Sequence, residues 1–371
     1  MPGYVRRGAA ACLVASLLAL GTAVPIAAAG ATGSGSHTAG TVTAAQAGAG
    51  WIARDMSANG ALIDADSHLA SPGDTANAIL ALVAAGVGAN QVKAATNWLS
   101  HNFASYVAFK GVDIPGRLAL VTLAAVAAGA NPARFGGTTK TYNLVARLEA
   151  TEQLTGSQAG AFGTETNLNA FSEALALVAL AAAKDLGKGT RLAEAYLENL
   201  QCTDGGWEYG RTTVATACLA PNPRDFNSPD TNTTALAVMA IVAAGGHFSH
   251  SPVTFFQDSQ ESNGSFGVYG VSGDGQQGDP DSTAYVIQAL IALRVINDHQ
   301  FVRNGTTPEQ ALQRFQYGCK SPVSKRGEYS YFGSPSQLAT LQAVPAAAGV
   351  TLPEMPGKLS VAEPRLSCGG S

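Results

Sequence analysis

Charged residues are scarce in this chain of 371 residues. Lys and Arg number 22 and Asp and Glu number 26, so charged side chains make up 13% of the sequence and the formal net charge is −4. No segment gathers Lys and Arg into a basic run. Because nucleic-acid-binding proteins neutralise phosphates with clustered cations, this composition excludes a nucleic acid as the partner.

Long apolar runs are missing after the first thirty residues. No later stretch offers the about 18 uninterrupted apolar residues that a membrane-spanning helix needs. Residues 1–29 combine Arg6 and Arg7 with the apolar run AACLVASLLALGTAV and with Ala27 and Ala29 at cleavage spacing, which is typical of a secretory signal peptide. We therefore expect cleavage near Ala29 and a secreted, extracellular protein without a stable membrane span, for which a cell-surface protein is an open partner.

Cysteines are few, and those that follow the signal peptide are even in number. Cys12 lies in the signal peptide, whereas Cys202, Cys218, Cys319 and Cys368 remain. Four cysteines in an exported chain predict two disulfides, for which three pairings are open. One pairing joins Cys202 to Cys218 around the DGGWEYG loop and Cys319 to Cys368 in the tail. Because no CxxC spacing occurs, we expect no metal site.

An alternation of Val, Ile and Thr long enough for a sheet is also absent, and Ala-rich helical segments recur instead. Each follows a more polar, amphipathic helical segment, and a loop with Gly before an apolar or aromatic residue joins the two. The period is roughly 40 to 60 residues, as in a repeat fold. The Ala-rich segments begin near Asp74, Gly116, Ser172, Asn232, Asp281 and, more loosely, Ser336; the polar segments lie around Trp51, Ala95, Tyr142, Ala193, Thr254 and Glu309.

These six pairs predict an all-α fold. The Ala-rich helix of each pair is apolar nearly all round and must be covered on more than one side, whereas the other helix is amphipathic and can face water. Six pairs closing into a ring give an (α/α)6 toroid over residues 46–350, with an Ala-rich inner ring; an open solenoid, which needs polar capping repeats, is the alternative. Residues 30–45 predict a disordered leader, and residues 351–371 form a C-terminal tail.

Two segments carry a resemblance to a known superfamily. QESNGSFGVYG followed by DPDSTAYVIQAL resembles the repeat of the terpenoid cyclase and protein prenyltransferase superfamily, also known as the prenyltransferase/squalene oxidase repeat. The resemblance covers roughly residues 46–350 and implies an α/α toroid. Members include class II terpene cyclases, prenyltransferase β subunits, complement thioester domains and the cobalamin-binding α-domain of transcobalamin.

Class II cyclases start their reaction with a D-x-D-D motif, whose middle Asp is the proton donor. The resemblance makes Asp281 the acid and Asp279 its flanking carboxylate, with Ser282 in place of the last Asp. The alternative is that Asp281 caps a helix, because Asp, Ser and Thr at a helix start accept backbone hydrogen bonds. Asp74, Ser172 and Asn232 occupy near-equivalent positions in other repeats, and this periodicity favours capping.

Two activities of the superfamily are excluded by missing residues. Protein prenyltransferases need zinc bound by Asp, Cys and His, and the six histidines of this chain are scattered. The complement thioester needs a Cys-Gly-Glu-Gln segment, which does not occur. A carbohydrate-active (α/α)6 enzyme remains open, with carboxylates at Glu165, Glu173 and Asp281 and with Trp207 and Tyr209 stacking a sugar.

We favour a non-catalytic toroid that binds a bulky, partly apolar small molecule at the mouth of the ring. Its resemblance to the transcobalamin α-domain makes a cobalamin-like compound the first candidate, and a corrinoid would be a ligand here, since no cofactor is evident. A cyclase-like enzyme using Asp281 is the second hypothesis, and a carbohydrate-active enzyme is the third. The candidate ligand-binding residues are Tyr269, Gln276, Gln277, Asp279, Asp281, Tyr285, Gln288, Asn232, Trp207, Tyr209 and Arg117.

Overall fold

The computed structural model describes residues 42–185, 188–223, 225–273, 278–351, 359–366 and 368. The predicted signal peptide, most of the predicted leader, and Gln276 and Gln277 lie outside these residues. Within the described ranges the chain is mostly helical, as predicted. No helix there is long and apolar enough to cross a lipid bilayer.

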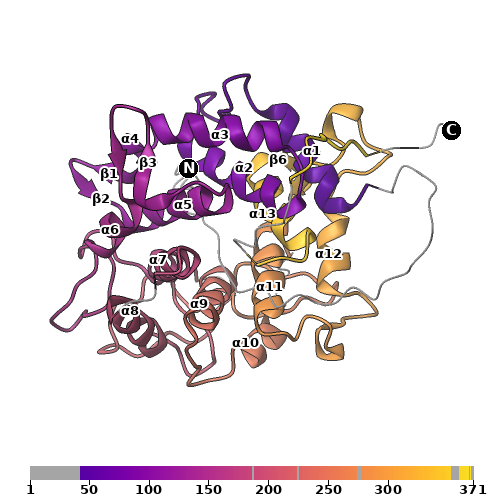
Figure 1. The fold of residues 1–371 in the computed structure, drawn as a ribbon. Helices are drawn as coiled ribbons and strands as arrows, with labels where there is room; N and C mark the ends of the chain where they lie inside the picture. The colour runs from indigo at the N-terminus through magenta and orange to yellow at the C-terminus, as the bar shows by residue number, and fades with distance from the viewer. Residues whose placement is uncertain are drawn as a thin grey trace, which may run out of the picture.

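Six apolar helices form a closed inner ring (Figure 1). Each packs against the next, and the last returns to the first, so the ring closes and the solenoid alternative is wrong. Nearly every side chain in these helices is buried, as the all-round apolar pattern predicted. The ring consists of α2 (Pro72–Ala85), α5 (Pro115–Ala127), α7 (Ala170–Ala182), α9 (Thr231–Ala244), α11 (Pro280–Ala292) and α13 (Gln337–Ala347).

A second set of helices packs outside this ring, one before each inner helix in the chain. For example, α1 packs on α13 and α2, and α12 packs on α11 and α13. The outer helices are α1 (Ala44–Asp55), α3 (Ala89–Asn102), α6 (Leu144–Glu149), α8 (Lys188–Asn199), α10 (Pro252–Ser259) and α12 (Pro308–Arg314). The structure is therefore an α/α toroid of six hairpins.

In the described parts of the connecting segments, the helices and strands are all short. Three antiparallel pairs of strands lie in the loops, each strand two or three residues long. They are β1 (Ala108–Phe109) with β2 (Val112–Asp113), β3 (Phe135–Gly136) with β4 (Thr141–Tyr142), and β5 (Tyr329–Tyr331) with β6 (Ser334–Ser336). The remaining short helices are α4 (Ala104–Val107), η1 (Pro132–Arg134), η2 (His299–Phe301) and η3 (Val323–Lys325).

Each inner helix follows an outer one in the chain, so the inner helices all begin at one end of the ring, which we call the N-terminal face. Hydrogen bonds between neighbouring repeats join these starts: the N–H of Ala170, which begins α7, donates to the carbonyl of Tyr209 in the loop before α9. Likewise, Asp230 before α9 pairs with Tyr269 in the loop before α11. Loops from different repeats therefore meet at this face.

Inner helices begin with side-chain caps, although not at the predicted residues. In five of the six, the residue before the helix accepts a hydrogen bond from the N–H three residues on. The predicted caps at Asp74, Ser172 and Asn232 are wrong, because these residues lie inside the first turn of their helices. The observed caps are Ser71, Asn169, Asp230, Asp279 and Ser336, and α5 alone starts at an apolar residue, Ile114.

A second hydrogen bond recurs at the fourth residue of the inner helices. There a side-chain oxygen accepts from the backbone N–H of the apolar residue in the preceding Gly-containing loop, which holds the loop against the helix. The pairs are Thr75 with Leu62 (2.9 Å), Glu173 with Phe162 (2.8 Å), Thr234 with Trp207 (2.9 Å), Thr283 with Phe266 (3.0 Å) and Thr340 with Tyr329 (2.9 Å).

Glutamine side chains connect each of the last three repeats to the next repeat. The amide of Gln260 donates to the carbonyls of Gly264 in its own loop and of Phe301 before the next outer helix. At the end of the chain, the Nε2 atom of Gln316 lies 2.8 Å from the carbonyl oxygen of Ala44 in α1. This bond joins the sixth repeat to the first and helps to close the ring.

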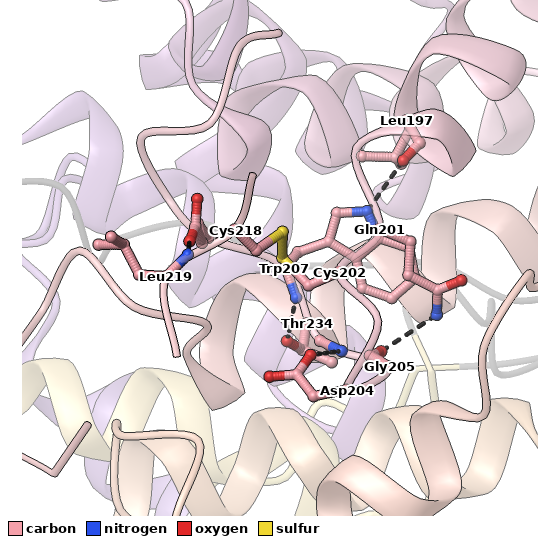
Figure 2. Close-up of a disulfide and its surroundings, with 11 residues drawn as sticks. Leu197, Gln201, Cys202, Asp204, Gly205, Trp207, Cys218, Leu219 and Thr234 are labelled. Carbon is pink, nitrogen blue, oxygen red and sulfur yellow. Dashed lines mark hydrogen bonds between the residues drawn. A yellow bond between two sulfur atoms is a disulfide. The ribbon is translucent and has the colours of Figure 1, made fainter. Parts of the chain in front are cut away.

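Both predicted disulfides are present. Of the three open pairings, the structure has the one that closes the DGGWEYG loop and joins the C-terminal tail to the last repeat. Cys202 bonds to Cys218 around the loop that contains Trp207 (Figure 2), and Cys319 bonds to Cys368. The described part of the tail packs back on the first repeats, where Arg54 donates to the carbonyl of Pro364 at 3.1 Å. Disulfides are typical of oxidising compartments, so they are consistent with an extracellular protein.

Candidate functional site

The candidate site lies where α11 begins, and Asp279 has the structural role there. Its Oδ1 atom accepts from the N–H of Ser282 at 2.7 Å, and its Oδ2 atom accepts from the Ser282 hydroxyl at 2.9 Å. Asp279 is 4% exposed, and burial raises its pKa to about 6 against the hydrogen bonds that lower it. Ser282 stands where the resemblance to the cyclase motif expects the last Asp. Its N–H and its hydroxyl both donate to Asp279, and neither donates to Asp281.

Asp281 is not the cap that the periodicity favoured. Pro280 occupies the first helical position, where its fixed φ and missing N–H are tolerated, so the cap falls on the residue before it and Asp281 lies inside the first turn. The Oδ1 atom of Asp281 is buried and has no hydrogen-bond partner among the described residues. Burial raises the pKa of Asp281 well above its usual range, and the charge of Asp279 raises it further.

Aromatic side chains meet inside the ring at the same level. Tyr285 follows Asp281 by one helical turn on the same face of α11 and is 1% exposed. Its ring lies 5.9 Å from that of Phe171 on α7, and Phe171 lies 6.4 Å from Tyr209. Because α9 separates α7 from α11 in the ring, the contact between Phe171 and Tyr285 crosses the interior, which is filled by side chains here.

The second residue of an inner helix lies at the level of this aromatic cluster in α7 and in α11. Phe171 and Asp281 both hold that position, as does half-buried Asn232 on α9 between them. In α2 and α5 the same position holds Gly73 and Gly116. In α13 it holds Leu338, so only α9 and α11 carry a polar side chain at their second helical position.

Asp230 adds another buried acid beside the cluster. It caps α9 by accepting from the N–H of Thr233 at 2.8 Å, and its backbone pairs with both Trp207 and Tyr269. Burial raises its pKa to about 6, and its charge contributes, after burial, to a raised pKa of Tyr209. Neither Asp230 nor Phe171 was among the residues predicted from the sequence. Aligning the repeats on Asp279, two residues before Asp281, would have found Asp230, two residues before Asn232.

Several predicted ligand-binding residues lie elsewhere. Trp207 is fully buried, with its Nε1 donating to the Leu197 carbonyl at 2.9 Å, so it packs in the core (Figure 2). Gln288 lies deeper on α11, where its Nε2 donates to the Ala284 carbonyl at 3.3 Å. Tyr269 stacks on exposed Phe226 with ring centroids 4.8 Å apart.

Arg117 lies in the second repeat and has a local partner. Its Nη1 donates to the carbonyl of Tyr106 at 3.2 Å, and its guanidinium lies over the Tyr106 ring at 5.1 Å. No ion pair joins Arg117 to an acid among the described residues. Arg117 is therefore held by cation–π and backbone contacts, apart from the cluster around Tyr285.

The carboxylates predicted for a carbohydrate site are not equally available to solvent. Glu165 is exposed in the loop before α7, whereas Glu173 is buried and engaged with the Phe162 N–H. Trp207, predicted to stack a sugar, is also buried. Among the described residues, Glu165, Glu173 and Trp207 therefore do not line one solvent-exposed groove.

A separate pocket lies outside the inner ring. Its volume is about 490 Å³. It is lined by α10, by the loops that precede α9 and α11, and by the segment before α12. The lining includes Asp204, Phe255, Asp258, Gly270 and Arg303. None of its lining residues belongs to an inner helix, so this pocket is distinct from the cluster at Asp281.

Solved structures share the fold at low sequence identity. The type II terpene cyclase MstE from Scytonema gives a TM-score of 0.52 at 13% identity over 82% of this chain and 96% of the cyclase. An inactive variant of the α-1,6-mannanase GH76A of Salegentibacter sp. HEL1_6, in complex with α-1,6-mannotriose, gives 0.53 at 11% identity over 82% and 97%. Since both are similar to this chain, the α/α toroid is shown and no activity is selected.

No protein-family model matches the chain, and no curated protein matches it in sequence. The chain covers 49% of ent-copalyl diphosphate synthase from Streptomyces platensis, with 74% of this chain aligned at 15% identity and a TM-score of 0.43.

Proposed function

We propose that the N-terminal face of the ring binds a bulky, partly apolar small molecule against Asp281 and the aromatic cluster. The observation that carries this proposal is the buried Oδ1 atom of Asp281, which has no partner among the described residues. A buried polar atom left unpaired costs about 1–3 kcal/mol, so a ligand that donates a hydrogen bond to it gains binding energy.

The neighbouring groups define the chemistry of such a ligand. Half-buried Tyr209, which packs against buried Phe171, offers aromatic surface, and the half-buried amide of Asn232 offers a donor and an acceptor. A molecule with an apolar body and amide or hydroxyl groups at its edge suits this combination. A corrinoid, whose ring bears amide side chains, is the first compound to test, in keeping with the resemblance to the transcobalamin α-domain.

Ligand-induced stabilisation tests the proposal. The full secreted chain is heated with a corrinoid, a tetrapyrrole and a terpenoid alcohol, and the Tm is compared with that of the ligand-free protein. A ligand that binds only the folded state raises the Tm. The rise should be lost in Asp281→Ala, which removes the acceptor, and kept in the control Glu165→Gln, an exposed acid of the same face. No shift with any compound, or an equal shift in Asp281→Ala, contradicts the proposal.

A second candidate function is proton transfer by Asp281. It is favoured by the same geometry, because Asp279 carries the capping role and leaves Asp281 as an acid whose pKa burial raises well above its usual range. A neutral carboxylic acid in an apolar site can protonate an alkene. Incubation with geranylgeranyl dihydroxybenzoate, the substrate named for MstE, tests this function. Conversion that Asp281→Asn abolishes supports it, and unchanged substrate counts against it.

A further inference from the structure

One inner helix, α7, makes the hydrogen bond between its fourth residue and the preceding loop with a residue type that the other helices do not use. The fourth residue is Thr in α2, α9, α11 and α13, and its hydroxyl accepts from the loop N–H in each. In α7 the fourth residue is Glu173, whose Oε2 atom accepts from the Phe162 N–H at 2.8 Å. The Oε2 atom of Glu173 therefore accepts the hydrogen bond that the Thr hydroxyl accepts in the other helices. The Oε1 atom takes no part in this bond.

The second oxygen of Glu173 is placed in the interior. The residue is 2% exposed, and its Oε1 atom is buried with no hydrogen-bond partner among the described residues. A Thr at this position would make the same loop bond without burying a charge. Since an unpaired buried carboxylate is costly, its presence calls for a partner.

Glu152 is an acid in the neighbourhood of Glu173. Its backbone pairs with Phe162, the residue whose N–H bonds to Glu173, so both acids converge on Phe162. The Oε1 atom of Glu152 is likewise buried without a partner among the described residues. After burial, the charge of Glu152 is the cause that raises the pKa of Glu173, and no Lys, Arg or His of the described chain forms an ion pair with either acid.

We propose that Glu152 and Glu173 together bind a divalent cation, with Ca²⁺ as the first ion to test. Two unpartnered carboxylate oxygens form an all-oxygen donor set, which suits hard cations such as Ca²⁺ and Mg²⁺ and not Zn²⁺. A bound cation pairs both buried oxygens and offsets the repulsion between the two acids. Glu149, an exposed acid whose charge raises the pKa of Glu152, leaves the solvent side of the pair electronegative.

Glu173→Thr is the decisive variant, because it installs the residue that four other repeats use. It keeps an acceptor for the Phe162 N–H and removes the second oxygen. Isothermal titration calorimetry of the chelator-treated full chain with CaCl₂, and separately with MgCl₂, measures binding near neutral pH. We expect one ion per chain and, at saturation, a Tm rise of about 5 °C, both lost in Glu173→Thr and in Glu152→Gln. The exposed control Glu165→Gln should bind as the unaltered chain does.

Two outcomes overturn the proposal. Absence of binding of either ion by the unaltered chain rules out the cation site. Equal binding by the unaltered chain and by a folded Glu173→Thr places the ion elsewhere. If Glu173→Thr does not fold, Glu173→Gln replaces it, since the amide oxygen can still accept from Phe162, and loss of Ca²⁺ binding in that variant supports the site.

Discussion

At the scale of single residues, two acids separated by Pro280 have different roles. Asp279 caps α11 with both oxygens on Ser282, whereas Asp281 has a buried oxygen without a partner among the described residues. The cap precedes the proline because a proline is accommodated in the first turn and does not need its own N–H bonded. The free energy of unfolding should therefore depend on Asp279, and ligand binding or proton transfer on Asp281.

Stability measurements on two variants check this division. Asp279→Ala removes the cap and a partner of the Ser282 hydroxyl, and we expect it to lower the free energy of unfolding by about 1–2 kcal/mol. Asp281→Asn replaces the carboxyl with an amide of the same shape at a position whose Oδ1 atom bonds to no described residue, so the free energy of unfolding should change by less than about 0.5 kcal/mol. Urea denaturation near neutral pH measures both. The reverse order would assign the cap to Asp281.

At the scale of elements, the loop between the two helices of a repeat is held by the inner helix. Thr234 accepts from the backbone N–H of Trp207, and the Trp207 ring is buried with its own N–H on the Leu197 carbonyl (Figure 2). The Gly205 backbone beside it has φ of +94° and lies against the Ser251 carbonyl, where a Cβ would fall 2.2 Å away. Only glycine fits this approach, which explains the Gly before the apolar residue.

Replacing Thr234 tests this contact between helix and loop. Thr234→Val keeps the volume and removes the acceptor, leaving the buried Trp207 N–H unpaired, so we expect a loss of about 1–3 kcal/mol in the free energy of unfolding. Thr96→Val on outer helix α3 is the matched control, because the Thr96 hydroxyl only donates to the Val92 carbonyl in its own helix. The control should change stability by less than about 0.5 kcal/mol. Thermal unfolding of both variants separates the two cases.

The helices could be predicted from the sequence more completely than the residues of the candidate site. Ala-rich stretches alternating with polar ones predicted six helix pairs, because a helix that is apolar on all sides has to be enclosed. The caps were misplaced by two or three residues, since several polar residues stand at each helix start and all are good capping types. The contact between Phe171 and Tyr285 could not be predicted, because it depends on the ring bringing α7 and α11 together across its interior.

At the scale of the whole molecule, ring closure makes the first and last repeats neighbours. The Gln316 amide donates to the Ala44 carbonyl at 2.8 Å and to the Gly327 carbonyl at 2.9 Å, and so joins the chain ends. Gln316→Leu leaves both carbonyls without this donor, and we expect the free energy of unfolding to fall by about 1–2 kcal/mol. Gln313→Leu, at an exposed position near the end of α12, is the control. A similar loss in both variants would mean that the bond does not contribute to closure.

Buried acids around the N-terminal face should also make the whole molecule more stable in mild acid than at neutral pH. Burial raises the pKa values of Asp230 and Asp279 from 3.8 to about 6. Between about pH 4 and 6 the folded chain therefore binds more protons than the unfolded chain, and the free energy of unfolding falls as the pH rises through this window. Glu152, with a pKa of about 7, extends the fall toward neutral pH.

Thermal unfolding at several pH values between about 4.5 and 7.5 measures this dependence, and we expect the Tm to decrease with rising pH. Asp230→Asn should flatten the curve, because an amide at the cap position cannot ionise and can still accept from the Thr233 N–H. Chelator is kept in all samples, since an ion bound by Glu152 and Glu173 would favour their ionised forms and oppose the trend. A Tm that increases from mild acid to neutral pH would mean that these carboxyl groups are stabilised as anions in the folded chain.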